Sequence, residues 1–202
     1  MRLLKSTAIA LLVSALYGCG GGGGGGGSST VSLSGVAAKG LIQKGKVEVF
    51  ATDSSGNLSS TPIATGVTLD DGTYSISVPP QSNPVVVKVS KGTGTTIIDE
   101  TAPAGTPAIA MPDDFIMRAV VPSIASTSTV GINPFTETAV AAIPANSFSA
   151  AMVKSSNDWV KQNLTGGVDP VTVSPNLSGS ASASDDQKLL TAALTSVAVA
   201  AK

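Results

Sequence analysis

Apolar and polar positions alternate in short runs along the first half of the chain, which is the pattern of half-buried β-strands. The alternating runs cover residues 31–36, 46–51 and 73–78, and a denser run rich in valine covers residues 84–89. Gly, Ser, Asn and Pro cluster between these runs, as they do in turns and loops. Short strands at this spacing predict a small β-sandwich over residues 31–99.

One turn and one aromatic residue stand out in this region. Asp70-Asp71-Gly72 precedes an alternating run, and Gly tolerates the positive φ of tight turns, so this tripeptide predicts a hairpin. Tyr74 follows it in the same alternating run. A tyrosine there could serve as a binding aromatic, but its place in a strong strand pattern favours a core position.

Residues 100–202 predict one strand followed by helices. Residues 115–122 form an apolar run that is a plausible strand. Asn133 can cap a helix that begins with Pro134, because proline favours the first helical position. Glu137 then lies near the positive end of the helix dipole. We therefore expect a mainly helical C-terminal region and an α+β fold overall.

Two longer helices are expected nearer the C-terminus. Residues 148–164 place Met152, Trp159 and other apolar residues at helical spacing. Trp159 could stack on a ligand or anchor at an interface, but because it shares a face with Met152 we favour a helix-packing core position. Ser184-Asp185-Asp186-Gln187 is a capping box that begins a final helix, and we expect this helix to pack on the one over residues 148–164.

The first thirty residues have a different character. A basic start with Arg2 and Lys5 is followed by an apolar run over residues 6–16, which is typical of a secretory signal and is too short to span a bilayer. We place the leader at residues 1–18. Residues 19–30 then contain Cys19, eight consecutive glycines, and Ser and Thr, a composition that predicts a flexible tether with a reach of roughly 15 Å.

Leu16-Tyr17-Gly18-Cys19 resembles the lipobox of bacterial lipoproteins, although Tyr17 stands where a small residue is usual. The resemblance implies cleavage before Cys19, a diacylglycerol on its sulfur and acylation of the new amine. Several acyl chains anchor a protein stably where one chain does so only marginally. Gly20 rather than Asp after the cysteine implies sorting to the outer membrane in a Gram-negative cell. The alternative is an ordinary secretory signal with a chance cysteine.

Three further segments resemble the carboxypeptidase-regulatory-like, transthyretin-type β-sandwich of many bacterial surface proteins. They are residues 34–36, 44–49 and 68–76, and the Asp-Gly-Thr-Tyr sequence at residues 71–74 is the most specific part. Gly45-Lys46 stands where a Pro and a Gly-Ala pair are usual. The resemblance covers about a third of the chain. It implies an accessory scaffold rather than an enzyme.

The amino-acid composition excludes several kinds of catalytic and metal-binding site. The sequence has no histidine and a single cysteine, which removes the commonest general base, an intramolecular disulfide and any Cys-based zinc site. Net charge is -1, and removal of residues 1–18 leaves 10 basic and 13 acidic residues, or -3, so nucleic acid is an unsuitable partner.

Acidic residues occur in three pairs that could serve as Ca²⁺ ligands. None has the spacing of an EF-hand loop, so we interpret them as solvated turns; the pairs are Asp70-Asp71, Asp99-Glu100 and Asp113-Asp114. Lys46 and Glu48 share one face of a strand, as in sandwiches with Lys–Asn isopeptide crosslinks, but no partner Asn is evident.

The sequence therefore predicts a non-enzymatic, membrane-tethered envelope lipoprotein that acts as a structural, display or protein-docking module. We expect lipidation at Cys19, with no catalytic residue, metal site or cofactor. The expected partners are the membrane and an envelope protein. A glycan or small-ligand binder is the alternative, which the small number of aromatic residues disfavours, and a hydrolase without histidine is a third hypothesis.

Overall fold

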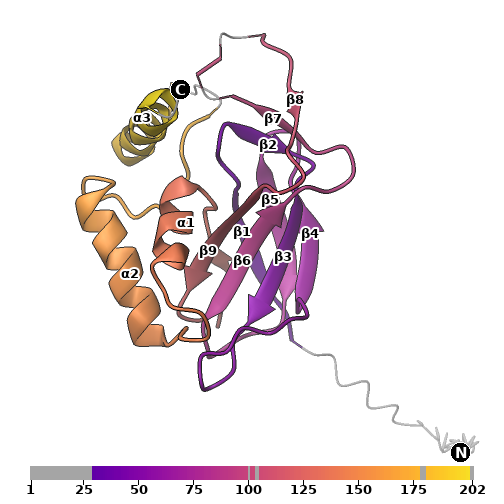
Figure 1. The fold of residues 1–202 in the computed structure, drawn as a ribbon, viewed down its shortest axis with the longest axis vertical. Helices are drawn as coiled ribbons and strands as arrows, with labels where there is room; N and C mark the ends of the chain where they lie inside the picture. The colour runs from indigo at the N-terminus through magenta and orange to yellow at the C-terminus, as the bar shows by residue number, and fades with distance from the viewer. Residues whose placement is uncertain (1–28, 100, 103–104, 178–180, 201–202) are drawn as a thin grey trace, which may run out of the picture.

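The computed structural model describes residues 29–99, 101–102, 105–177 and 181–200, which form an α+β body (Figure 1). No helix within these residues is both long enough and apolar enough to cross a bilayer. The helices are α1 (Pro134–Ala141), α2 (Ala150–Asn163) and α3 (Asp185–Ala200). The strands are β1 (Val31–Val36), β2 (Leu41–Gln43), β3 (Lys46–Ala51), β4 (Ala64–Val67), β5 (Thr73–Val78), β6 (Val85–Ser90), β7 (Thr96–Ile98), β8 (Ile109–Ala110), β9 (Ile116–Val121) and β10 (Ser128–Thr129).

The described strands form three sheets. Their strand orders are β10-β1-β5, β2-β7-β8 and β4-β3-β6-β9. Neighbouring strands are antiparallel except for β1 and β10, which pair in parallel. The three-stranded sheet around β1 and the four-stranded sheet pack on a common hydrophobic core, to which both contribute alternate residues of their strands.

The predicted alternation is confirmed in β3 and β5. Ile76 and Val78 of β5 point into the core, to which Val47 and Val49 of β3 also belong. Tyr74 lies in the same core, as expected from its strand, and its hydroxyl donates a hydrogen bond of 2.5 Å to the backbone oxygen of Val130. Burial raises the pKa of this phenol, so it remains a neutral hydrogen-bond donor.

The predicted boundary between residues 99 and 100 does not mark the end of the β-structure. β9 lies beyond it and pairs with β6 along six residues of each strand, and β10 pairs with β1. Met117 and Ala119 of β9 point into the shared core because their strand alternates in the same register as its neighbours. The sheets therefore extend to residue 129, and only the chain beyond that residue is mainly helical.

The hairpin predicted at residues 70–72 is wrong, although its tight turn is present. Gly72 has φ of 76°, and its N–H donates to the Leu69 oxygen. β4 and β5 on either side of the turn belong to different sheets. Gly66 of β4 lies directly on Ile76 of β5, since a Cβ there would be 2.6 Å from the Ile76 side chain. The turn therefore carries the chain from one sheet to the other.

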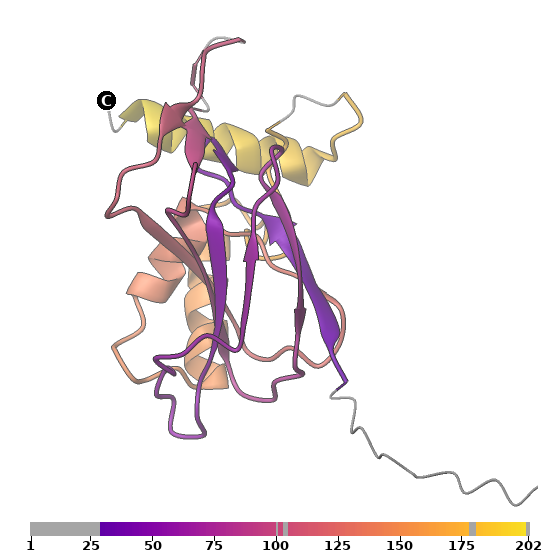
Figure 2. The same cartoon turned by 90° about the vertical axis from the view of Figure 1, so that its right-hand side faces the viewer.

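α1 and α2 cover the part of the outer side of the four-stranded sheet around Val86 and Val120, next to β9, and α3 covers one end of the body. Val140 of α1 and Val153 of α2 pack on Val86 and Val120 of the sheet. α3 lies across one end of the strands (Figure 2), with Leu190 and Leu194 turned inward. The prediction that α3 packs on the helix over residues 148–164 is therefore correct only at Val160, because α3 shares its cluster chiefly with α1 and the segment after α2.

Substitution of Gly35 tests how closely β1 approaches Val130, the residue that follows β10. A Cβ at this position would lie 1.9 Å from the Val130 oxygen, the acceptor of the Tyr74 hydroxyl. We expect Gly35→Ala to lower the free energy of unfolding in urea by about 3 kcal/mol, because backbone must move. Gly94→Ala is the control, since Gly94 has φ of 73° but nothing near its Cβ position, and should cost about 1 kcal/mol. Equal losses would contradict the close contact.

Candidate functional site

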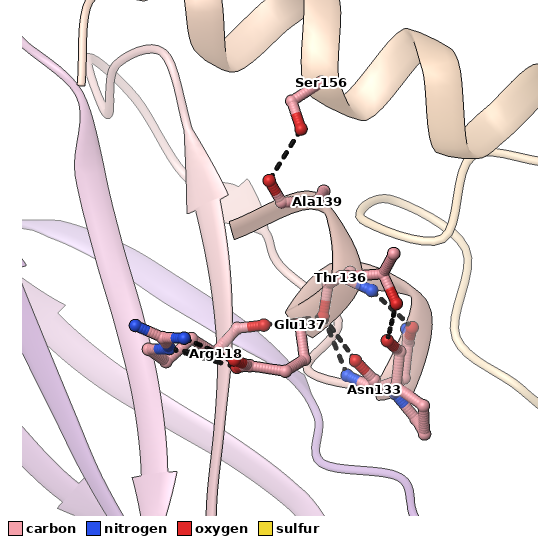
Figure 3. Close-up of polar contacts among 8 residues, drawn as sticks. Arg118, Asn133, Thr136, Glu137, Ala139 and Ser156 are labelled. Carbon is pink, nitrogen blue, oxygen red and sulfur yellow. Dashed lines mark hydrogen bonds and ion pairs between the residues drawn. The ribbon is translucent and has the colours of Figure 1, made fainter. Parts of the chain in front are cut away.

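The start of α1 fixes how the helices sit on the sheet (Figure 3). Asn133 has extended backbone angles, and its Oδ1 accepts hydrogen bonds of 3.1 Å from the N–H groups of both Phe135 and Thr136. The Thr136 hydroxyl oxygen accepts the Asn133 N–H in return, at 2.9 Å. This reciprocal capping box, together with Pro134 at the first helical position, explains why the helix begins here and confirms the predicted cap.

Asn133 also joins α1 to a distant part of the chain. Its Nδ2 donates a hydrogen bond of 2.8 Å to the backbone oxygen of Pro170, and its side chain is fully buried. The N–H of the neighbouring Gly131 donates to the Val171 oxygen. The segment after α2 is thus held to the start of α1. Both the oxygen and the nitrogen of the buried Asn133 amide have hydrogen-bond partners.

α1 is attached to β9 by a backbone contact and an ion pair. The Thr136 hydroxyl lies 2.9 Å from the Arg118 backbone oxygen and can donate to it. The Arg118 guanidinium binds the Glu137 carboxylate, with Nε 3.1 and 3.2 Å from its two oxygens and a second nitrogen on Oε1 (Figure 3). Hydrogen bonding to Glu137 raises the pKa of Arg118, so the guanidinium remains charged over the ordinary pH range.

α2 completes the attachment. Asn157 Nδ2 donates 2.9 Å to the Val120 oxygen of β9, and the Ser156 hydroxyl donates 2.6 Å to the Ala139 oxygen of α1. Asn157 Oδ1 is buried without a partner. Side chains of both helices therefore bind backbone oxygens on the outer edge of β9, which an edge strand would otherwise expose to another strand.

This attachment leaves one side of α2 in solvent. Trp159 is 54% exposed and Met152 is 41% exposed, while Val153 and Val160 are buried. The predicted core position of Trp159 is therefore wrong. Trp159 and Met152 do share a face, but Val153 and Val160 have the same seven-residue spacing and occupy the face toward the sheet. Spacing alone could not decide between these two pairs.

We call the exposed side the Trp159 stripe. The stripe lines a shallow hollow of about 340 Å³ between α2 and the end of α1. The residues of the stripe, none of them charged, are Ala142, Met152, Ser155, Ser156 and Trp159. The Ser149 hydroxyl caps the start of α2 by accepting the Met152 N–H at 3.2 Å. Lys154 and Asp158 pair at 2.5 Å in the adjoining hollow along α2.

A second surface lies on the outer side of the four-stranded sheet. Glu48 is only 7% exposed and binds Lys46 and Lys88 at 2.7 Å each. The Lys88 ammonium also lies 4.9 Å from the centre of the Phe50 ring. Burial by itself raises the pKa of Glu48, but the hydrogen bonds and charges of the two lysines outweigh it and lower the pKa.

The other predicted site residues have simpler surroundings. Cys19 and Glu100 lie outside the described residues. Asp71 accepts hydrogen bonds from the N–H and hydroxyl of Thr73, and Asp113 binds Lys91 at 2.5 Å. Within the part of the chain that the structure describes, no three acidic or cysteine side chains gather as a metal-binding group.

The sequence matches no family model, and no curated protein or solved structure is similar to it at a significant level. The function of this chain must therefore be inferred from its own residues.

Asn133 and Ser149 allow a comparison of two helix caps in one protein. Asn133→Ala would leave two N–H groups and the Pro170 oxygen unsatisfied in the interior, and should lower the free energy of unfolding by about 3 kcal/mol. Ser149→Ala removes a cap from an exposed helix end and should cost about 1 kcal/mol. Urea denaturation followed by circular dichroism measures both. A smaller loss for Asn133→Ala would contradict the role of the buried cap.

Glu48 predicts a dependence of stability on pH. Its pKa in the folded chain is below its ordinary value of 4.5, so its contribution is present above pH 4.5 and is lost as pH falls through the lowered value. We expect Glu48→Gln to lower stability at pH 7 and to reduce the further loss between pH 5 and pH 3. Asp113→Asn is the control: Lys91 also lowers the pKa of Asp113, but solvent screens this exposed pair, so the variant should change the pH profile less than Glu48→Gln does. An unchanged pH profile in Glu48→Gln would contradict this assignment.

Proposed function

We propose that this protein is a lipid-anchored, non-enzymatic module of the bacterial cell envelope, which displays or docks another envelope component. The observation that carries the proposal is the order of segments along the chain. A leader-like segment ends at Cys19, a glycine run follows, and the first paired strand begins at Val31. The sequence features that suggest lipidation thus precede the folded body, as an anchor requires.

The absence of histidine from the sequence supports a non-enzymatic role. The packing of two sheets on a common core supports, as part of this proposal, a transthyretin-type sandwich that serves as a scaffold. We also propose the outer membrane as the location, on the strength of Gly20 after Cys19.

We propose the part of the outer side of the four-stranded sheet that the helices leave uncovered as the surface for a protein partner. One row across it runs Val67, Lys46, Ser90 and Ile116, with exposed apolar residues at both ends. The next row contains Glu48, Lys88 and Arg118. Three cations and the two acids Glu48 and Glu137 leave a charge of +1 on a chain of net charge -1, which favours an acidic partner.

A glycan binder is the alternative. Stacking on sugars needs exposed aromatic rings, and Trp159 is the one strongly exposed aromatic among the described residues. Tyr74, Phe135 and Phe148 are buried, and Phe50 and Phe115 are half-buried. The protein-docking role is therefore the better supported of the two.

Lipidation at Cys19 is the direct test. We expect native protein to begin at Cys19 with a mass that includes a diacylglycerol and an amide-linked acyl chain, and to sediment with membranes. Cys19→Ala should move to the soluble fraction, because only the anchor is lost. Ser28→Ala, a change in the same segment that keeps the sulfur, should stay in the membrane fraction. A free thiol in native protein, or membrane-bound Cys19→Ala, would contradict the proposal.

A further inference from the structure

We propose that the Trp159 stripe lies against the surface of the lipid bilayer that carries the anchor. This inference rests on the proposed lipidation of Cys19. It assigns an orientation to the folded body, with the exposed side of α2 toward the membrane and the uncovered part of the outer side of the four-stranded sheet open to a partner.

The chemistry of the stripe suits the interface between lipid headgroups and acyl chains. Tryptophan is enriched there because its ring is apolar and its indole N–H can bind a polar headgroup. Met152 lies on the same face of the helix, and Ser155 and Ser156 line the hollow between the two side chains. On its other side Trp159 borders the Lys154–Asp158 ion pair. α2 has two basic residues, Lys154 and Lys161, and one acidic residue, Asp158, so its net charge is positive and suits anionic headgroups.

The anchor brings this surface within reach of the bilayer. A chain from Cys19 to Val31 extends to roughly 40 Å at most. β1 and α2 both begin at the same end of the body (Figures 1 and 2), so α2 starts at the end where the tether enters. Because attachment to the bilayer keeps the local lipid concentration high, a weak contact is enough to hold the body against it.

The size of the stripe favours a lipid surface over a folded partner. Met152 and Trp159 are its only large apolar side chains, whereas a stable protein interface buries about 800 Å² on each partner. An aromatic side chain supplies at most about 250 Å². Contact with lipid requires no complementary shape, so two apolar side chains can contribute without a matching partner.

Trp159 is the only tryptophan in the chain, so its fluorescence reports on this surface alone. The experiment uses full-length native protein, with its mass measured first, reconstituted in vesicles of zwitterionic and anionic phospholipid. We expect emission at shorter wavelength than in Cys19→Ala free in buffer, reduced access of iodide, and loss of emission when the vesicles contain brominated acyl chains. Met152→Glu should reverse these changes, whereas Ile116→Glu, at a residue that is 54% exposed on the sheet, should leave them intact.

Each other outcome overturns the inference in a distinguishable way. Lipidated protein whose Trp159 emits as in water and is open to iodide would retain the anchor and refute the orientation. A blue shift in native membranes but not in pure lipid would mean that a protein covers the stripe. A blue shift that depends on protein concentration without lipid would mean a second copy. An unmodified Cys19 with no vesicle binding would refute both proposals.

Discussion

The outer edge of β9 imposes the constraint on which the arrangement of the helices depends. An edge strand carries backbone oxygens that need donors, and burial without them is costly. Here Thr136 lies within hydrogen-bond distance of the Arg118 oxygen and Asn157 donates to the Val120 oxygen. Because these donors belong to α1 and α2, the edge is covered only when each helix has the position and the rotation about its own axis that bring its donor to the strand. Because Asn157 must reach the β9 edge, the opposite side of α2, which carries Trp159, is left exposed.

Charge reinforces this arrangement without determining it. The Arg118–Glu137 pair is partly exposed, and ion pairs of that kind contribute little to stability. Glu48 differs because it is mostly buried and has two ammonium partners, so removal of either partner would leave its charge less well compensated. The outer side of the sheet thus combines an ion-paired centre with exposed apolar residues at its borders, a distribution compatible with protein contact.

Local sequence patterns predicted individual strands and helix starts well, but they did not predict which strands lie side by side. The strands at residues 31–36, 46–51 and 73–78 and the cap at Asn133 follow from alternation and from capping chemistry, which act over a few residues. Strand partners depend on contacts between distant residues, so the sequence could not show that β9 joins β6 or that the turn at Gly72 links two sheets. The short strands β2, β4, β8 and β10 lack a pattern long enough to detect.

Trp159 and Asn157 show the same limit at the candidate site. Helical spacing correctly placed Met152 and Trp159 on one face, but Val153 and Val160 offered an equally spaced alternative, and only the position of the sheet selects between them. Nothing near Asn157 in the sequence indicates that its amide binds the edge of a strand some 37 residues earlier. The row of charges across β3, β6 and β9 likewise exists only once the strands are in register.

The position of β1 has a mechanical consequence. β1 is the first strand after the proposed anchor, and it lies between β5 and β10 rather than at the edge of its sheet. Tension applied to its N-terminal end acts along the strand, so the ladder of six residue pairs with β5 is loaded in shear and its hydrogen bonds resist together. A strand peeled from an edge would instead lose its bonds one at a time. This topology suits the proposed anchor, because it would let the body withstand traction between a membrane and a bound partner.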